Sequence, residues 1–339
     1  MVFTSFAGRS YNVVSDQVKQ SDSFDEIPMI DLSQPQAQVV DSLRDACTRV
    51  GFFSISNHSI PQSVIDQVFS TAAEFFSLDD AAKQQAHFKN GTALCGYEGF
   101  QNVYTDETKK PDLNEAFSWR YGPDMDQFSE PNKNIEESKQ ESNPDDKKED
   151  FLTSGQNIWP NAKPEMRRDI SQYYSHLGSM GKILHYPPQR AKGPDPPFGI
   201  GAHTDIECFT ILCQGGDVPA LQVLNPNGEW ILVPPIRGTF VVNIGDMLAR
   251  WSNDTFRSTI HRVLNITGQE RYSLPVFIGP SYQTIIQPLE TCLADGAKYD
   301  PIPAGLYVWK RLAISRLDKD EYEKQLVKME NHLTPAINV

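Results

Sequence analysis

The stretch "GAHTDIECFTILCQ", residues 201–214, places a histidine and an aspartate two positions apart and then turns apolar. In an extended chain successive side chains point to opposite faces, so His203 and Asp205 would share one face and could reach a common atom. A histidine and a carboxylate that converge in this way are typical of a metal site. The aromatic and β-branched residues that follow predict a strand.

Short β-type runs continue from this stretch to residue 288. Turn signals such as "NPNG", residues 225–228, separate them at intervals that suit an antiparallel sandwich or barrel. The runs are "CFTILCQ", "ALQVLN", "EWILVPP", "TFVVNIG", "STIHRVLN" and "YSLPVFIGP". We therefore predict a mainly β fold with flanking helices, built on a double-stranded β-helix (jelly-roll) core over residues 180–290.

Segments on both sides of this core have other patterns. Residues 26–120 predict an N-terminal region of strands and helices, in which apolar residues recur at helical spacing after Pro61. Residues 121–160 form an acidic stretch that predicts a solvated loop, and residues 303–331 predict an amphipathic C-terminal helix. The first 25 or so residues lack periodicity and are expected to form a loose arm. No internal repeat is evident, so we expect one domain over residues 1–339.

Composition excludes several classes of partner. The chain has 31 Lys and Arg against 44 Asp and Glu, a net charge of −13, and no basic stripe, so we expect neither nucleic acid nor membrane as a partner. No apolar run is long enough to span a bilayer, and no signal-peptide pattern is present. The five cysteines are widely spread and lack CxxC spacing. We expect reduced thiols, a cytoplasmic protein and no obligate protein partner.

A second histidine completes the candidate metal site. His261 lies in "STIHRVLN", another predicted strand of the core. Two imidazoles and one carboxylate on one face of an ion leave other coordination positions open, which is characteristic of non-haem Fe(II) oxygenases. A structural zinc site would need four closed ligands, and the sequence offers no such set. His203, Asp205 and His261 are therefore the candidate catalytic and metal-binding residues.

An arginine and a serine further along the chain predict an anion site. In "RYSLPVF" Arg271 and Ser273 share one face of a strand by the same alternation. A guanidinium with a neighbouring hydroxyl is suited to a carboxylate, which it binds bidentately in a partly buried place. The predicted partner is a small diacid.

These motifs resemble the iron(II)- and 2-oxoglutarate-dependent dioxygenases of the isopenicillin-N-synthase-like group. The stretches "EIPMIDLS" and "GFFSISNHSI" resemble the family's N-terminal region, and "DLNEAFSW", residues 112–119, resembles its helical middle. The family's catalytic core is resembled by "HYPPQ", "HTDIECFTILCQ", "ALQV", "VVNIGDMLARWSND", "STIHRV" and "RYS". The resemblance covers most of residues 26–315, and details such as "GQNIWP" are most similar to fungal members that act on small molecules.

The resemblance implies a complete set of cofactors. Fe(II) would be held by the three candidate ligands, and the distal carboxylate of 2-oxoglutarate by Arg271 and Ser273. Tyr186 would lie beside the same co-substrate or the substrate. With O₂, 2-oxoglutarate would be decarboxylated to succinate and CO₂ while a C–H bond of a small molecule is oxidised, in fungal secondary metabolism. Ascorbate is expected to support activity.

Two other functions stay open at this point. An oxidase that takes all its electrons from its substrate, as isopenicillin N synthase does, could use Arg271 for a substrate carboxylate. A non-catalytic relative could keep the fold and serve a binding role, although the intact ligand set argues against it.

Two stretches depart from the family pattern. Glu207 stands where the family usually has a small residue, and its carboxylate would either meet a basic group of the substrate or face solvent. In residues 171–188 a predicted helix runs almost directly into the next strand, where family members add another helix and loop. Without that helix, apolar surface of the jelly roll is expected to be uncovered, at about 25 cal/mol per Å².

Overall fold

The computed structural model describes most of the chain, namely residues 2–5, 7–14, 18–20, 27–90, 95–100, 112–120, 125, 157–175, 180–189, 198–314 and 319–333. The chain divides into two compact units. The first unit holds Met1–His58, Gly99–Glu115 and Leu184–Val339, and the second holds Ser59–Glu98 and Ala116–Ile183. Most of the expected acidic loop lies outside the described residues, and the single domain stays a prediction.

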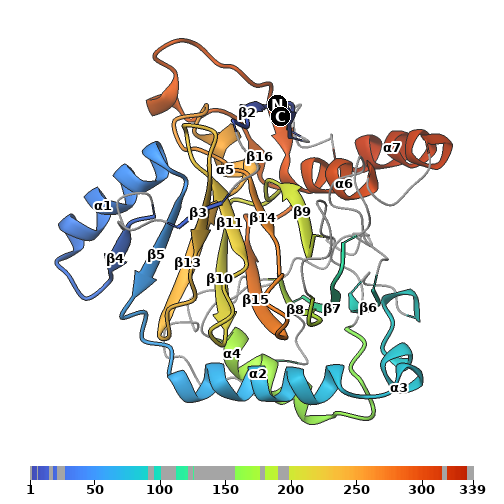
Figure 1. Ribbon diagram of the computed structural model, residues 1–339. Coiled ribbons are helices and arrows are strands. Elements are labelled where there is room, and N and C mark those ends of the chain that lie inside the picture. The colour runs from blue at the N-terminus through green and yellow to red at the C-terminus, as the bar shows by residue number, and fades with distance from the viewer. Residues whose placement is uncertain are drawn as a thin grey trace. The chain divides into compact units, whose positions relative to one another are not determined.

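Two β-sheets of the first unit form the predicted core (Figure 1). One sheet contains, in this order, β4 (Met29–Asp31), β5 (Phe52–Ser56), β13 (Thr239–Ile244), β10 (Phe209–Gly215) and β15 (Arg271–Ile278). The other has the order β3 (Val18–Gln20), β12 (Trp230–Val233), β11 (Leu221–Leu224), β14 (His261–Val263) and β9 (Ile200–His203). All the β-type runs of the sequence from residue 201 onward therefore lie in these two sheets.

Strand β10 lies at the centre of the first of these sheets. It pairs antiparallel with β13 on one side and with β15 on the other. In this register Thr210 is the partner of Asn243 on β13 and of Phe277 on β15. Residues that are direct cross-strand partners project from the same face of a sheet, so the register decides which side chains meet in the interior.

Helix α1 (Gln36–Arg49) packs on the strands at one edge of this sheet. Its buried residues Ala46 and Cys47 contact Phe53 of β5. Between the helix and β5, Gly51 has a φ of 74°, and a Cβ there would lie 2.1 Å from the carbonyl oxygen of Arg257. Only glycine fits that approach, which fixes where β5 enters the sheet.

The N-terminal segment is more ordered than expected. Strands β1 (Val2–Thr4) and β2 (Ser10–Asn12) form an antiparallel hairpin, and β3 runs parallel to β12. The expectation of a loose arm is therefore wrong for these described residues. Specific polar contacts hold the segment, among them a hydrogen bond from the Val14 amide to the Gly228 carbonyl oxygen at 2.8 Å. Such contacts leave no periodic signal in the sequence.

Helices near the C-terminus cover one end of the first unit. The predicted helix over 303–331 corresponds to α6 (Ala304–Ile314) and α7 (Lys319–Leu333), and residues 315–318 lie outside the described residues. The two helices contact each other through stacked rings of Trp309 and Tyr322, 5.6 Å apart. Val308 of α6 packs with Met247 of the short helix α5 (Asp246–Trp251).

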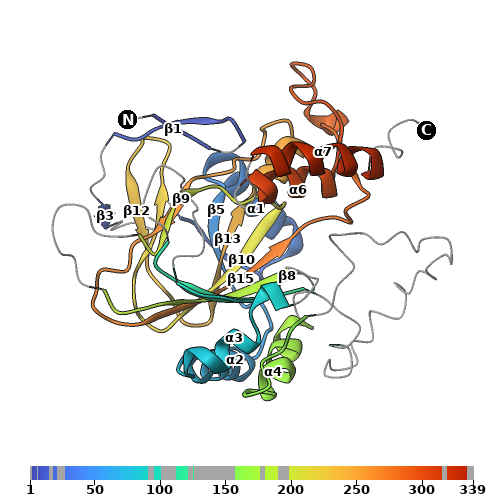
Figure 2. The same ribbon diagram turned by 90° about the vertical axis from the view of Figure 1, so that its right-hand side faces the viewer.

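The second unit is built around two helices that lie side by side, α2 (Gln62–Phe76) and α4 (Glu165–Tyr174) (Figure 2). Apolar residues of α2 recur at helical spacing and are buried, as predicted from the sequence after Pro61. The buried carboxylate of Asp169 on α4 accepts a hydrogen bond from Thr71 of α2 at 2.5 Å. Helix α3 (Asp80–Gln85) follows α2.

The stretch "DLNEAFSW" is not helical. Glu115–Trp119 form strand β7, whose register with β6 (Gly96–Glu98) pairs Tyr97 with Phe117. The reading of this stretch as part of a helical middle is therefore wrong. All five residues of β7 are buried. Such burial on both faces suits a strand better than a helix with one apolar stripe.

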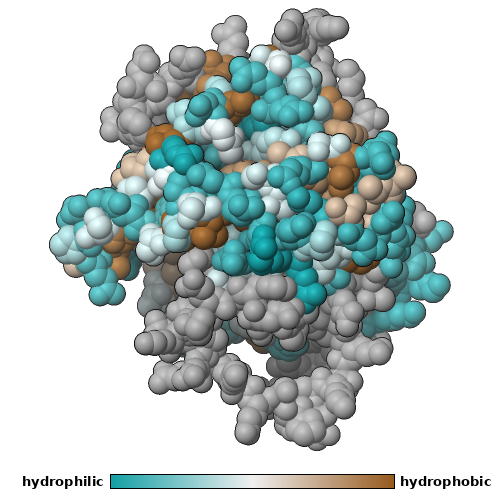
Figure 3. All heavy atoms as spheres, turned by 90° about the horizontal axis from the view of Figure 1, so that it is seen from below, coloured by the Kyte–Doolittle hydropathy of each residue, from teal (hydrophilic) through white to brown (hydrophobic). Residues whose placement is uncertain are grey.

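In the next strand, β8 (Met180–Tyr186), Met180 and Lys182 are half-buried and the other five residues are buried. Ile183 and Leu184 are both buried, although an uncovered jelly roll was expected here. On the face shown in Figure 3, the apolar residues of the described surface form small separate patches. Among the described residues no helix combines the length and the apolar content that crossing a membrane requires.

Candidate metal centre

The three candidate ligands come together inside the first unit. His203 ends β9 and His261 begins β14, and they are direct partners in the pairing of these strands. Oδ1 of Asp205 lies 3.5 Å from Nε2 of His203 and 3.6 Å from Nε2 of His261. These atoms form the one cluster of three possible metal ligands found in the described part of the chain. The predicted convergence is therefore present.

The route to this convergence differs from the prediction in one respect. Strand β9 ends at His203, and Asp205 lies in the turn that leads to β10. The premise that one strand carries both residues is therefore wrong. The turn is fixed by a hydrogen bond from the amide of Asp246 to the carbonyl oxygen of Asp205 at 2.8 Å.

Hydrogen bonds to the backbone set the tautomers of the two histidines. Nδ1 of His203 lies 2.8 Å from the carbonyl oxygen of Gly201, and Nδ1 of His261 lies 3.3 Å from that of Thr259. A carbonyl oxygen only accepts, so each Nδ1 donates and each Nε2 is the ring nitrogen that faces Asp205. The ring of Phe52 packs edge-on against His261, with centroids 5.2 Å apart. Both imidazoles are thus held in the form that binds a metal.

Two residues that the sequence did not single out hold the aspartate. Oδ2 of Asp205 accepts a hydrogen bond from Nδ2 of Asn243 at 2.8 Å and another from the hydroxyl of Thr210. Both donors project from the interior face of paired strands, as partners in the β10–β13 register. They occupy one carboxylate oxygen and leave the other facing the histidines. Asn243 and Thr210 can be recognised as supporting residues only once the pairing of β10 with β13 is known.

The pKa shifts favour metal binding at two of the three candidate ligands and oppose it at the third. Burial opposes ionisation of Asp205, but the charge of His261 and the hydrogen bond from His203 outweigh it and lower the aspartate pKa. Burial, followed by the charge of His203, lowers the pKa of His261 to about 4. Burial also lowers the pKa of His203, but the hydrogen bond to Asp205 raises it overall, so an arriving cation competes with a proton there.

Arg271 forms a second buried polar group in the same unit. Its guanidinium lies over the ring of Tyr186, 4.8 Å from the centroid, and its Nη2 donates to Oε1 of Gln214 at 3.1 Å. Its Nε and Nη1 are buried and have no hydrogen-bond acceptor among the described residues. The hydroxyl of Ser273 donates to that of Tyr186 at 3.4 Å. The structure thus brings Arg271, Ser273 and Tyr186 together, and two unsatisfied donors fit a carboxylate ligand.

Glu207 is buried, with 8% of its surface exposed, so the alternative that it faces solvent is wrong. Burial, and then the charge of Asp205, raise its pKa to about 7.

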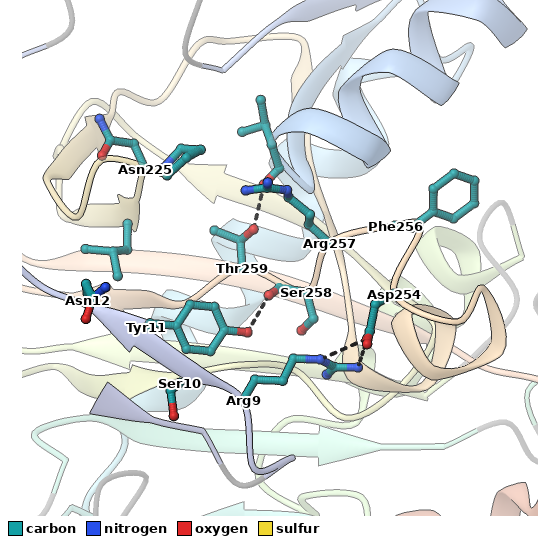
Figure 4. Close-up of a pocket in the computed structure, with 13 residues that line it drawn as sticks. Arg9, Ser10, Tyr11, Asn12, Asn225, Asp254, Phe256, Arg257, Ser258 and Thr259 are labelled. Atoms are coloured by element: carbon teal, nitrogen blue, oxygen red, sulfur yellow. Dashed lines mark hydrogen bonds and ion pairs between the residues drawn. The ribbon is translucent and has the colours of Figure 1, made fainter. Parts of the chain in front are cut away.

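A separate pocket (Figure 4) is lined by Tyr11, Arg257 and other residues and by none of the candidate ligands. At that pocket the guanidinium of Arg9 donates to Asp254.

Comparison with known proteins gives the family. Residues 172–280 match the model of the 2OG-Fe(II) oxygenase superfamily, and residues 27–162 match the model described as non-haem dioxygenase in morphine synthesis N-terminal. The chain is 33% identical over 334 residues to a 2-oxoglutarate-Fe(II) type oxidoreductase of Metarhizium majus, with 85% of this chain and 87% of the relative covered. The chain belongs to the 2OG-Fe(II) oxygenase superfamily. The oxygenase is also 32% identical over 318 residues to a homoarginine-6-hydroxylase of Arabidopsis thaliana, with 85% and 94% covered.

Solved structures agree with this assignment. The oxygenase superposes on the crystal structure of a full-length Neurospora crassa protein in complex with alpha-KG with a TM-score of 0.69 and 26% identity, covering 88% of this chain and 99% of that chain. The predicted fold class, mainly β with a jelly-roll core, is confirmed. The family depends on Fe(II) and 2-oxoglutarate, so the chain is a 2-oxoglutarate-dependent oxygenase. The predicted resemblance is confirmed as well.

Proposed function

We propose that this oxygenase oxidises a C–H bond of a small molecule at an Fe(II) ion held by His203, Asp205 and His261. The observation that carries the proposal is the convergence of two Nε2 atoms and one carboxylate oxygen in a cluster where Asp205 and His261 are buried and His203 is half-buried. Two imidazoles and one carboxylate leave coordination positions open for other ligands. The backbone hydrogen bonds at both Nδ1 atoms support the same assignment.

The bound ion would supply the oxidising chemistry, in which O₂ converts 2-oxoglutarate to succinate and CO₂ while the substrate loses hydrogen. Arg271 would bind the distal carboxylate of 2-oxoglutarate through its two unsatisfied donors. Ser273 and Tyr186 would offer hydroxyls to the same co-substrate. Arg271 and Ser273 are each 1% exposed, which supports a binding place from which bulk water is excluded.

The substrate would be a small molecule of fungal secondary metabolism. Support comes from the relatives, which include a fungal 2-oxoglutarate-Fe(II) type oxidoreductase and a plant enzyme named for the hydroxylation of homoarginine. The net charge of −13 supports an enzyme without nucleic acid or an anionic membrane as partner. We also propose a cytoplasmic location, no obligate protein partner and a supporting role for ascorbate.

Anaerobic titration of metal-free protein with Fe(II) and then 2-oxoglutarate tests the proposal. The expected result is a weak visible charge-transfer band in the wild type that is absent in His203→Ala. In Arg271→Ala the concentration of 2-oxoglutarate needed for half saturation is expected to rise by about tenfold or more, because a buried charge-assisted pair is lost. Arg257→Ala, at an exposed arginine of the same unit, is the matched control and should leave the band unchanged.

The outcomes separate the proposal from its rivals. Iron binding without a band, together with O₂ uptake in the absence of 2-oxoglutarate, would favour the oxidase. A band in the wild type with no oxidation of any small molecule, and tight binding of a partner protein, would favour the non-catalytic relative. A band that survives in His203→Ala would contradict the assigned ligand.

A further inference from the structure

Glu207 differs from every other buried carboxylate in the described part of the chain. Among the described residues, no hydrogen bond or ion pair reaches its side chain, although only 8% of the residue is exposed. Each of the other six buried carboxylates accepts at least one hydrogen bond. These six are Glu98, Asp112, Glu115, Asp169, Asp205 and Asp246. A largely buried carboxylate that no described residue satisfies is suited to a donor carried by a bound molecule.

The residues on either side of Glu207 are held by apolar packing. Ile206 and Cys208 pack into an apolar cluster with Met247 of α5 and Val308 of α6. The segment is anchored by a hydrogen bond from the Cys208 amide to the carbonyl oxygen of Ile278 at 3.0 Å. The Glu207 side chain does not join that cluster.

The carboxylate of Glu207 lies instead over Gly279, the first residue after β15. A Cβ at position 279 would lie 2.2 Å from its Oε2, so any other residue there would displace the carboxylate. By strand alternation, position 279 follows Phe277 on one face of the chain. Phe277 is the cross-strand partner of Thr210, whose hydroxyl holds Asp205. The Glu207 carboxylate therefore lies on the face of the sheet that carries the metal centre.

The same face carries Arg271 and Ser273 at the other end of β15, by the same alternation. The strand thus presents a buried guanidinium at its start and a buried carboxyl group just beyond its end. Among the described residues, two donors of Arg271 lack an acceptor and no donor reaches the Glu207 carboxylate. One group donates hydrogen bonds and the other accepts them, so they are suited to different molecules: Arg271 to the acid co-substrate and Glu207 to a molecule with a basic nitrogen.

We propose that Glu207 determines substrate specificity by pairing with a positively charged nitrogen, an ammonium or a guanidinium, so that the substrate class is cationic small molecules. This inference rests on the proposed function, because it assigns the substrate side of the same centre. The ion pair forms in a buried place, where a charge-assisted hydrogen bond is stronger than at the surface. A neutral analogue of the same shape leaves the carboxylate unpaired.

Matched probes that differ in charge test the proposal. L-Arginine is compared with L-citrulline, and L-lysine with L-norleucine, by calorimetric titration of anaerobic enzyme loaded with Fe(II) and 2-oxoglutarate; succinate formation in air is the second readout. We expect the cationic member of at least one pair to bind about tenfold more tightly or better. In Glu207→Gln this preference should fall to about twofold or less, because the amide keeps the shape and loses the charge.

Two further variants separate recognition from damage. Gly279→Ala leaves Glu207 in place but displaces its carboxylate, so it should reduce the same preference. Glu290→Gln, at an exposed glutamate, should leave the preference unchanged. A wild type with a normal charge-transfer band and no preference for either cation overturns the proposal and leaves the proposed function intact. A preference that survives in Glu207→Gln overturns it too, whereas a missing band in the wild type refutes the proposed function instead.

Discussion

At the scale of single residues, the chemistry of the site depends on how firmly one carboxylate is held. Asp205 has one oxygen tied to Asn243 and Thr210 and the other directed at the two histidines. Supporting partners of this kind orient a ligand before the metal arrives. The oxygen that faces the histidines is therefore already in position, and the Asp205 side chain need not change its rotamer when a metal binds.

Replacing Asn243 should weaken the binding of iron. Asn243→Ala removes one of two donors to Oδ2, and we expect the dissociation constant for Fe(II) to rise by about 10-fold to 100-fold. Anaerobic titration with Fe(II) measures the change. Asn265→Ala is the matched control, because Asn265 is a buried asparagine that donates to the carbonyl oxygens of Pro187 and Gln269. An equal loss of affinity in the control would contradict the assigned role of Asn243.

The sequence could predict the site residues that stand out by residue type and spacing. It could not predict the residues whose role depends on how the strands pair. His203, Asp205, His261, Arg271 and Ser273 follow from residue type and spacing, and the structure brings them into two buried groups. Thr210 and Asn243 are ordinary strand residues until β10 is paired with β13. The buried state of Glu207 depends likewise on a glycine 72 positions away.

At the scale of elements, strands were predicted better than their ends and their edges. The apolar runs of the core all became strands, because alternation and β-branched residues report burial directly. The end of β9 before Asp205 was missed, since an amide of α5 fixes that turn. Strand β7 was mistaken for part of a helical region, and the N-terminal hairpin for a loose arm, because both are defined by contacts distant in the sequence.

The attachment of the N-terminal hairpin should depend on pH through Asp254. Burial raises the pKa of this carboxyl, but hydrogen bonds from Arg9 and Tyr299 outweigh it, so the pKa is lowered. The unfolded chain then takes up a proton first as pH falls. The contribution of Asp254 to the free energy of unfolding is therefore complete above about pH 4 and is lost as pH falls through the lowered pKa.

We therefore expect Asp254→Asn to be less stable than the wild type at pH 6, with a difference that shrinks toward pH 3. Urea unfolding at several pH values measures this difference. Asp217→Asn, at an exposed aspartate of the same unit, should match the wild type throughout. A difference for Asp254→Asn that stays constant with pH would show that the contact does not depend on the carboxylate charge.

At the scale of the whole molecule, the buried Arg271 would link stability to a co-substrate bound to it. Two of its donors have no acceptor among the described residues, which is unfavourable in the unliganded protein. A ligand that binds only the folded state stabilises it by mass action. The jelly-roll fold that buries Arg271 could be predicted from the strand pattern and the motifs. The number of domains is still a prediction.

Adding 2-oxoglutarate should therefore raise the melting temperature. At a ligand concentration about 100 times the dissociation constant the gain is about 2.7 kcal/mol. For a chain of 339 residues that corresponds to a shift of roughly 4 °C by calorimetry. Arg271→Met should lose most of the shift, and Arg257→Ala should keep it. A shift of equal size in Arg271→Met would mean that the acid is bound elsewhere.

The contacts of Asp246 carry a practical consequence. Its buried carboxylate accepts hydrogen bonds from Arg9 at 2.8 Å, from Arg311 at 2.9 Å and from Thr204 at 2.9 Å. Arg9 stands close to the start of the chain, Arg311 belongs to α6 and Thr204 lies between two candidate ligands of the metal. Anyone who trims this enzyme or fuses a purification tag to it is therefore working on segments fastened to the turn that carries Asp205, and placement of the tag requires the same care as a substitution in that turn.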